Sequence, residues 1–557
     1  MKLRILSYGL LAAGLGVSHF AVGEEQDERF ECSPEDQAAL GVELPLERQL
    51  RRLSLDLRGV TPTMEDYAEL DGKDTIPADL VDAFLASDDF RKQMRRYHED
   101  LLWTNPNPTL PDVGYQLVSN TVGTAKLFGV NSGGKRKAFR GGDGTHTCQD
   151  KLQSDPSLGY DAAGVPIAEP MGSDPVGPFF QEGYVEVLPY WETDPAKSIK
   201  VCAFDAQERA ESFVDGAGVS VSCDSQAATS RKECGCGPNV DYCIVTTPVA
   251  TQVLAGFREQ FLRSVDDHTV NGEPYSALLT SKRKWTNGPL SHYLKYLAHR
   301  QTFVRTQNWI PPGDESNPDI PFIEGETWLE SERPGAHAGV LTLPAFLLRF
   351  QTNRGRANRF RIAFQDKFYE PPSTLDDSCA PEGEDLTIRC VCRGCHVSLE
   401  PLASYFGQFA EAGSTALSTL PSSFDSLQEC IVASAPLGTA YCERFYEPVP
   451  DLFDPDIRPY KLKALRFADD EHLEVQAHFD AGPIAWASEI IESGEFHQVA
   501  VEHLFTFLMK REPDLDKLSP TFEGHELELI GENFKEHDDI TQAVREILAL
   551  PAYRRAR

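Results

Sequence analysis

The sequence predicts a mainly α, multi-domain protein that carries an irregular, disulfide-rich α+β insert. Apolar residues recur at helical spacing in the N-terminal, central and C-terminal parts of the 557-residue chain. One long stretch between them is instead rich in Gly, Pro, Ser, Asp and Cys, and the chain has 13 cysteines. A chain of this length exceeds what one hydrophobic core usually holds, so we expect several domains or subdomains.

An N-terminal helical domain is predicted over residues 24–127. Apolar residues recur at helical spacing from Leu46 to Leu57, and Gly59 follows where a helix would end. Thr61-Pro62 would then begin a second helix, since proline suits a first helical turn. A further helical pattern runs from Phe90 to about Trp103.

The insert is predicted over residues 128–249. Tyr184–Leu188 and Cys243–Val245 have the composition of strands. A stretch with so little apolar periodicity can stay ordered when disulfides hold it together. We expect the cysteines from Cys223 to Cys243 to pair among themselves or with Cys202.

Helical periodicity returns after the insert and predicts two more helical domains, over residues 250–370 and 451–557. Between them lies a segment over residues 371–450, which opens at Pro371-Pro372 and holds the motif discussed below.

The first residues predict an export signal. Lys2 and Arg4 precede an apolar run to about Phe20, and the small residues Ala21-Val22-Gly23 follow. We therefore expect residues 1–23 to be a signal peptide and the protein to be exported to the periplasm or cell surface of a Gram-negative bacterium. The rest of the sequence has no run of 18 apolar residues, so no membrane span is expected.

The charge of the chain limits its partners. The formal net charge is −33 at pH 7, which disfavours binding to nucleic acid or to anionic membranes. It favours a partner protein with a basic patch, although a solvated acidic surface would explain the same composition.

The most specific motif is Cys392-Arg393-Gly394-Cys395-His396. Two cysteines at this spacing can form thioethers with the vinyl groups of a haem, and the adjacent imidazole can bind the iron. Haem is attached in this way outside the cytoplasm, which agrees with the export signal. The motif therefore predicts one covalently bound haem c with His396 as the proximal iron ligand.

Two other interpretations of these cysteines remain open. Cys390, Cys392, Cys395 and His396 could together bind a structural zinc ion, although adjacent Cys and His residues fit one tetrahedron poorly. Alternatively, these cysteines could form ordinary disulfides, and Cys390 could pair with Cys379.

Several stretches of the sequence resemble one group of proteins, the Planctomycete-type cytochrome c families. These are cytochrome-c-associated domains of unknown function in large exported bacterial proteins. The similar stretches are Leu50–Thr63, His337–Arg354, Cys395–Gly407 and Gly494–Arg511. The resemblance implies a haem and a helical architecture, but no particular reaction.

The second axial ligand of the haem has three candidates. His337 stands just before a segment that resembles the family, and we expect it to be presented at a helix start. His503 and Met509 fall on apolar helical patterns, where packing in a core is the alternative explanation.

Five arginines form a basic group in this acidic chain: Arg349, Arg354, Arg356, Arg359 and Arg361. A haem brings two propionates, and the planar guanidinium group matches a carboxylate. We predict that Arg354 and Arg359 bind the haem in this way, with ion pairs to nearby carboxylates as the alternative.

Three functions fit these features. Electron transfer needs the fewest assumptions, because a haem with both axial positions filled exchanges electrons without binding a substrate. The alternatives are a haem-dependent oxidoreductase with an open sixth position, and a binding or structural scaffold in which a zinc or disulfide site replaces the haem. The sequence does not decide whether the protein is an enzyme.

Overall fold

The computed structural model describes the chain in separate ranges. These are residues 41–104, 116–122, 124–131, 148–158, 168–169, 179–180, 183–214, 218, 220–223, 234–245, 248–298, 317–369, 390–409, 413–414, 416, 446–448, 460–462, 473–519 and 522–556. The predicted signal peptide lies outside the described residues, as does most of the segment over residues 371–450.

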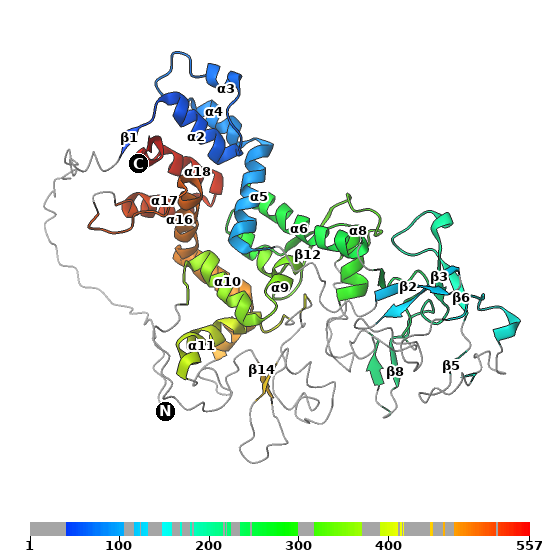
Figure 1. The fold of residues 1–557 in the computed structure, drawn as a ribbon. Coiled ribbons are helices and arrows are strands. Elements are labelled where there is room, and N and C mark those ends of the chain that lie inside the picture. The colour runs from blue at the N-terminus through cyan, green and yellow to red at the C-terminus, as the bar shows by residue number, and fades with distance from the viewer. Residues whose placement is uncertain are drawn as a thin grey trace.

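The described part of the chain is mostly helical, as predicted. Figure 1 shows the helices gathered into one elongated body, with the strands of the insert at one end of it. The helices are α2 (Leu46–Arg58), α3 (Met64–Ala68), α4 (Ala78–Leu85), α5 (Asp88–Leu102), α6 (Pro248–Thr269), α7 (Ala277–Thr280), α8 (Gly288–His292), α9 (Pro344–Arg349), α10 (Asn353–Gln365), α11 (Cys390–Ala403), α14 (Leu473–Asp480), α15 (Pro483–Ser493), α16 (Glu495–Met509), α17 (Gly524–His537) and α18 (Ile540–Ala549).

Five strands of the insert form one sheet in the order β10-β2-β3-β7-β6. Strand β10 pairs with β2, and β3 with β7, in parallel, while the other neighbours are antiparallel. These strands are β2 (Gln116–Val122), β3 (Ala125–Asn131), β6 (Tyr184–Val187), β7 (Ile199–Cys202) and β10 (Ile244–Val245).

The remaining strands form two-stranded pairs. They are β1 (Val42–Glu43) with β15 (Arg555–Ala556), β4 (Ala168–Glu169) with β5 (Phe179–Phe180), β8 (Ser212–Val214) with β9 (Ser220–Ser222), β11 (Arg283–Thr286) with β12 (Leu329–Glu332), and β13 (Tyr446–Pro448) with β14 (Tyr460–Leu462).

The start of the helical body follows the sequence pattern closely. Helix α2 ends at Gly59, which adopts the left-handed conformation (φ 70°) that glycine tolerates best. The next helix, α3, is capped by Thr63 rather than by Thr61. The Thr63 hydroxyl accepts from the Asp66 backbone N–H, and the Asp66 carboxylate accepts from the Thr63 N–H. This reciprocal capping box fixes the start of a helix of only five residues.

The helical segments share one hydrophobic core. A single cluster of buried residues extends from Leu50 in α2 through Phe257 in α6 and Phe360 in α10 to Ile547 in α18. Strands β1 and β15 pair the two ends of the described chain. The helical domains predicted from the sequence are therefore packed together as parts of one body.

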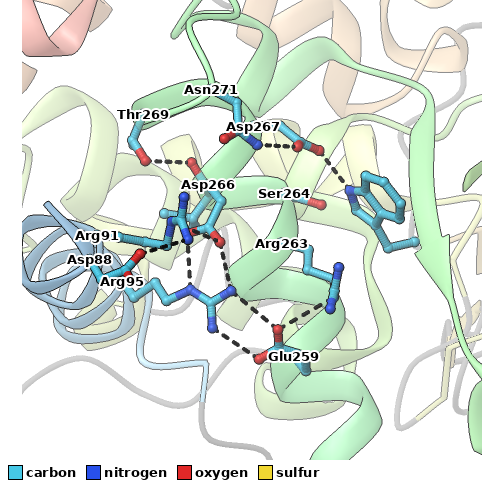
Figure 2. A network of polar contacts seen from close by, with 12 residues as sticks. Asp88, Arg91, Arg95, Glu259, Arg263, Ser264, Asp266, Asp267, Thr269 and Asn271 are labelled. Atoms are coloured by element: carbon cyan, nitrogen blue, oxygen red, sulfur yellow. Dashed lines mark hydrogen bonds and ion pairs between the residues drawn. The ribbon is translucent and has the colours of Figure 1, made fainter. Parts of the chain in front are cut away.

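A network of charged side chains reinforces this body between α5 and α6 (Figure 2). Arg95 on α5 donates to both oxygens of Asp266 (2.9 and 2.6 Å) and pairs with Glu259 (3.0 Å). The next residue, Asp267, accepts from the Trp285 indole N–H at 2.7 Å and so connects α6 to β11. Hydrogen bonding to Asp266 and Glu259 outweighs burial and raises the pKa of Arg95.

Disulfides hold the insert together, as the sequence predicts. The three bonds are Cys148–Cys202, Cys223–Cys234 and Cys236–Cys243. The cysteines from Cys223 to Cys243 thus pair among themselves. Disulfides of this kind are typical of an oxidising compartment outside the cytoplasm.

Strands β2 and β3 pair antiparallel between Gln116 and Asn131, and the boundary predicted at residue 128 falls within this pair. The domain boundaries stay predictions. The predicted strands at residues 184–188 and 243–245 are confirmed as β6 and β10. Within the described ranges, no helix has the length and apolar character needed to cross a bilayer.

Candidate haem-binding site

The predicted haem motif lies on helix α11. Cys392 and Cys395 are three residues apart on this helix and therefore point to the same side of it. His396 lies four residues after Cys392, next to the same face. Both thiols are unpaired and half-buried. One helical turn thus presents the two thiols and the imidazole together.

The imidazole of His396 is held by a carboxylate from its own helix. Its Nδ1 lies 2.5 Å from Oε1 of Glu400, one turn further along α11. A carboxylate only accepts, so the proton of this hydrogen bond is on Nδ1. In the neutral imidazole, the other ring nitrogen, Nε2, carries no proton and can bind a metal ion.

The same carboxylate is shared with helix α10. Arg354 Nε donates to Glu400 Oε1 at 2.6 Å, the oxygen that also faces His396. The Glu400 side chain is only 12% exposed and that of Arg354 is 26% exposed, so this charge pair is partly shielded from water. His396, Glu400 and Arg354 therefore form one polar chain across the contact between α10 and α11.

Gly394 lies on the other side of α11 from the thiols and the imidazole, because it is two residues away from both Cys392 and His396. It is exposed, and no described atom other than its chain neighbours and the backbone of its own helix lies within 4 Å of a Cβ added to it. On the motif side, two unpaired thiols and an oriented imidazole fit a covalently attached haem.

The end of α11 is anchored by aromatic packing. Tyr405, just after the helix, stacks on Trp486 at 5.4 Å between ring centroids, and Trp486 stacks on Phe360 of α10 at 3.9 Å. The Tyr405 hydroxyl also lies 2.8 Å from Nδ1 of His478 in α14. Burial raises the pKa of Tyr405. These contacts fix α11 against α10, α14 and α15.

The structure brings His337 close to the chain that follows α11. The ring of His337 lies 5.4 Å from that of Phe409, which is fully buried. The carbonyl of Phe409 in turn accepts from Arg356 in the first turns of α10, near Arg354. His337 and His396 are thus both connected to the start of α10.

The structure places His503 beside the end of α10. Nε2 of His503 lies 3.6 Å from Asp366, the residue after α10. This contact explains the position of His503 without iron ligation, and its role as a second ligand stays a prediction.

Met509 also lies away from α11. Its sulfur accepts from Arg52 of α2 at 3.4 Å, at the C-terminal end of α16. The N-terminal end of α16 is the part that contacts α10, through the hydrogen bond from Gln365 to Glu495. Among the described contacts of the three candidates, that of His337 with Phe409 reaches the chain just after α11.

The other candidate haem-binding arginine, Arg359, makes contacts within the helical body. Its guanidinium donates to the backbone carbonyl of Leu101 at the end of α5 and lies over the Trp103 ring at 4.1 Å. Burial lowers the pKa of Arg359 to about 10. Its role toward a haem propionate stays a prediction, because these contacts already explain its position.

A structural zinc ion is one alternative to a haem at this motif. In the described part of the chain, no three His, Cys, Asp or Glu side chains converge as a ligand set. Cys379 and the side chain of Cys390 lie outside the described residues, so the zinc and disulfide interpretations stay untested.

The sequence interpretation missed Glu400. The signal was present, because a glutamate four residues after a histidine faces it on a helix. The partnership with Arg354 could not be predicted, because these residues are 46 positions apart and meet only when α10 packs on α11.

Comparisons with known proteins add no relative. No family model, curated protein or solved structure matches the chain. The similarity to the Planctomycete-type families therefore remains a prediction from the sequence motifs.

Proposed function

We propose that the protein is an exported c-type cytochrome that carries one covalent haem and transfers electrons. The observation that supports it most is the state of the motif. Cys392 and Cys395 are unpaired on one face of α11, and the hydrogen bond to Glu400 uses Nδ1 of His396 and leaves Nε2 for the iron.

Each of four residues would have one role in binding the haem. Cys392 and Cys395 would attach the haem, and His396 would be the proximal ligand. A haem held there supplies a one-electron couple between Fe(III) and Fe(II). His337 is our candidate for the second axial position, because its contacts with Phe409 lead back to the start of α10.

The electron must come from and go to another molecule. A chain with a formal net charge of −33 would attract a redox protein that presents a basic patch. Such an association should weaken as salt is added, because the Debye length falls to about 8 Å at physiological ionic strength.

The proposal is tested by the reduced pyridine-haemochrome spectrum of protein matured with a haem-attachment system. We expect a c-type band in the wild type and none in the Cys392→Ala/Cys395→Ala variant. Absence of the band from the wild type would reject the proposal and make zinc analysis the next step.

Binding of carbon monoxide then distinguishes an electron carrier from a haem-dependent enzyme. A haem with both axial positions filled should not bind it, whereas His337→Ala should open the sixth position and allow binding. The matched controls His503→Ala and Met509→Leu should leave the haem closed. Binding by the wild type would instead favour a haem-dependent oxidoreductase.

A further inference from the structure

The polar chain of His396, Glu400 and Arg354 suggests how this haem would be tuned, and the inference rests on the proposed function. We propose that Glu400 is a positioning residue that holds His396 through its Nδ1–H, and that Arg354 sets the strength of this hydrogen bond. The sequence motif alone assigns neither role.

The first step of the argument is geometric. The hydrogen bond between Nδ1 of His396 and Oε1 of Glu400 is 2.5 Å long, shorter than the about 2.7–2.9 Å usual for an N–H donor to a carboxylate. Both residues belong to α11, so the helix itself sets their distance. The bond fixes the tautomer and the ring orientation of His396.

The second step concerns electron density. A carboxylate that accepts from Nδ1–H makes the imidazole a stronger donor at Nε2 than a neutral acceptor would. A stronger donor stabilises Fe(III) relative to Fe(II) and lowers the reduction potential. Glu400 should therefore lower the potential of the haem.

The third step concerns Arg354, which acts in the opposite direction. Its guanidinium donates to the same oxygen, Oε1, that His396 faces. A cation on this oxygen withdraws charge from it and weakens its pull on the imidazole proton. Arg354 should therefore raise the potential, and its effect should depend on the presence of Glu400.

The experiment is a redox titration of the haem in holoprotein, with the pyridine-haemochrome spectrum of the same samples as a check of haem content. In Glu400→Gln we expect the equilibrium between Fe(III) and Fe(II) to shift about tenfold toward Fe(II), which is about +59 mV for one electron. In Arg354→Gln we expect a shift toward Fe(III).

Glu400→Asp separates the hydrogen bond from the charge. This variant keeps the negative charge but withdraws the oxygen from Nδ1, so the proposal predicts a rise in potential close to that of Glu400→Gln. If Glu400→Asp instead behaves like the wild type while Glu400→Gln shifts, the charge alone acts and the proposal is wrong.

A double variant tests the role of Arg354. In the Glu400→Gln background, Arg354→Gln should change the potential less than it does in the wild type, because the shared oxygen no longer carries the negative charge that the guanidinium withdraws. Equal changes in both backgrounds would reject the role assigned to Arg354. Full haem content with unchanged potentials in all variants would reject this inference alone, whereas a wild type without haem would reject the proposed function.

Discussion

The insert and helix α11 use cysteine in opposite ways. In the insert, six cysteines form three disulfides across short strands and turns. On α11, Cys392 and Cys395 stay unpaired although they are only three residues apart. In a chain whose other described cysteines are oxidised to disulfides, two neighbouring thiols that stay free are available for another reaction.

The difference also reflects how the two regions are stabilised. Among the described residues, the helical body has a large hydrophobic cluster, whereas the clusters of the insert are small and include buried cysteines. Covalent bonds replace a large core in the insert. In the described part of the helical body, Cys392 and Cys395 form no disulfide and could bind a cofactor.

The largest effect is expected when the two cysteines of the motif are replaced. We expect Cys392→Ser/Cys395→Ser to lose all covalent haem, because no thioether can form. The matched control Cys236→Ser/Cys243→Ser should keep full haem content. The ratio of haem to protein absorbance measures both. Retention of covalent haem by the first variant would contradict the role assigned to Cys392 and Cys395.

The next effect concerns stability of the insert. Loss of the Cys148–Cys202 bond, which closes a separation of 54 residues, should lower the free energy of unfolding of the insert by about 4 kcal/mol. Loss of Cys236–Cys243, with a separation of seven, should cost about 2 kcal/mol.

Limited proteolysis with and without reductant would report these changes region by region. We expect reduction to expose the insert to cleavage and to leave the helices α15 to α18 protected. Equal loss of protection in both regions would contradict the account in which disulfides stabilise the insert and hydrophobic packing stabilises the helical body.

A smaller effect is expected at Arg359 in the helical body. Arg359→Ala removes the donor to the Leu101 carbonyl and the cation over Trp103. We expect a loss of about 2 kcal/mol in the free energy of unfolding, measured by urea denaturation. A fall in the haem potential of the same variant would support the predicted propionate contact, and an unchanged potential would leave only the structural role.

The last effect, which is absent at neutral pH, is a pH dependence of the body that involves no cysteine. His98 is fully buried, its Nδ1–H donates to the Met94 carbonyl, and burial lowers its pKa to about 4. The unfolded chain, with a pKa near 6.5, binds the proton more readily. Stability contributed by neutral His98 is therefore lost as the pH falls from 6.5 through about 4.

His98→Gln tests this dependence. Each pH unit in that window should cost the wild type up to about 1.4 kcal/mol, and the variant should show a flatter profile. Urea denaturation between pH 7 and pH 4 measures the slopes. The same slope in both proteins would show that His98 does not cause it.

Local signals explain which elements could be predicted from the sequence. The apolar spacing of Leu50, Leu53 and Leu57 and the following glycine predict α2 because these contacts lie within one helix. Strands β6 and β10 follow from β-branched and aromatic composition. The motif on α11 is local for the same reason.

What could not be predicted depends on contacts between distant residues. Arg333 is buried and donates to the carbonyl of Gly339 and to the hydroxyl of Thr342, and this helps fix the chain around His337. The pairing of β1 with β15 joins residues more than 500 positions apart. Sequence periodicity does not specify such partners, because they form only when the whole body packs.

The central claim is most directly tested by mass spectrometry of the peptide that contains Cys392, Cys395 and His396, digested without reduction from protein matured in the periplasm of a haem-attaching host. The account predicts a peptide heavier by one haem, while the peptides with Cys148, Cys223 and Cys236 are recovered as disulfides. A peptide with free thiols, or with a disulfide between Cys392 and Cys395, would contradict it.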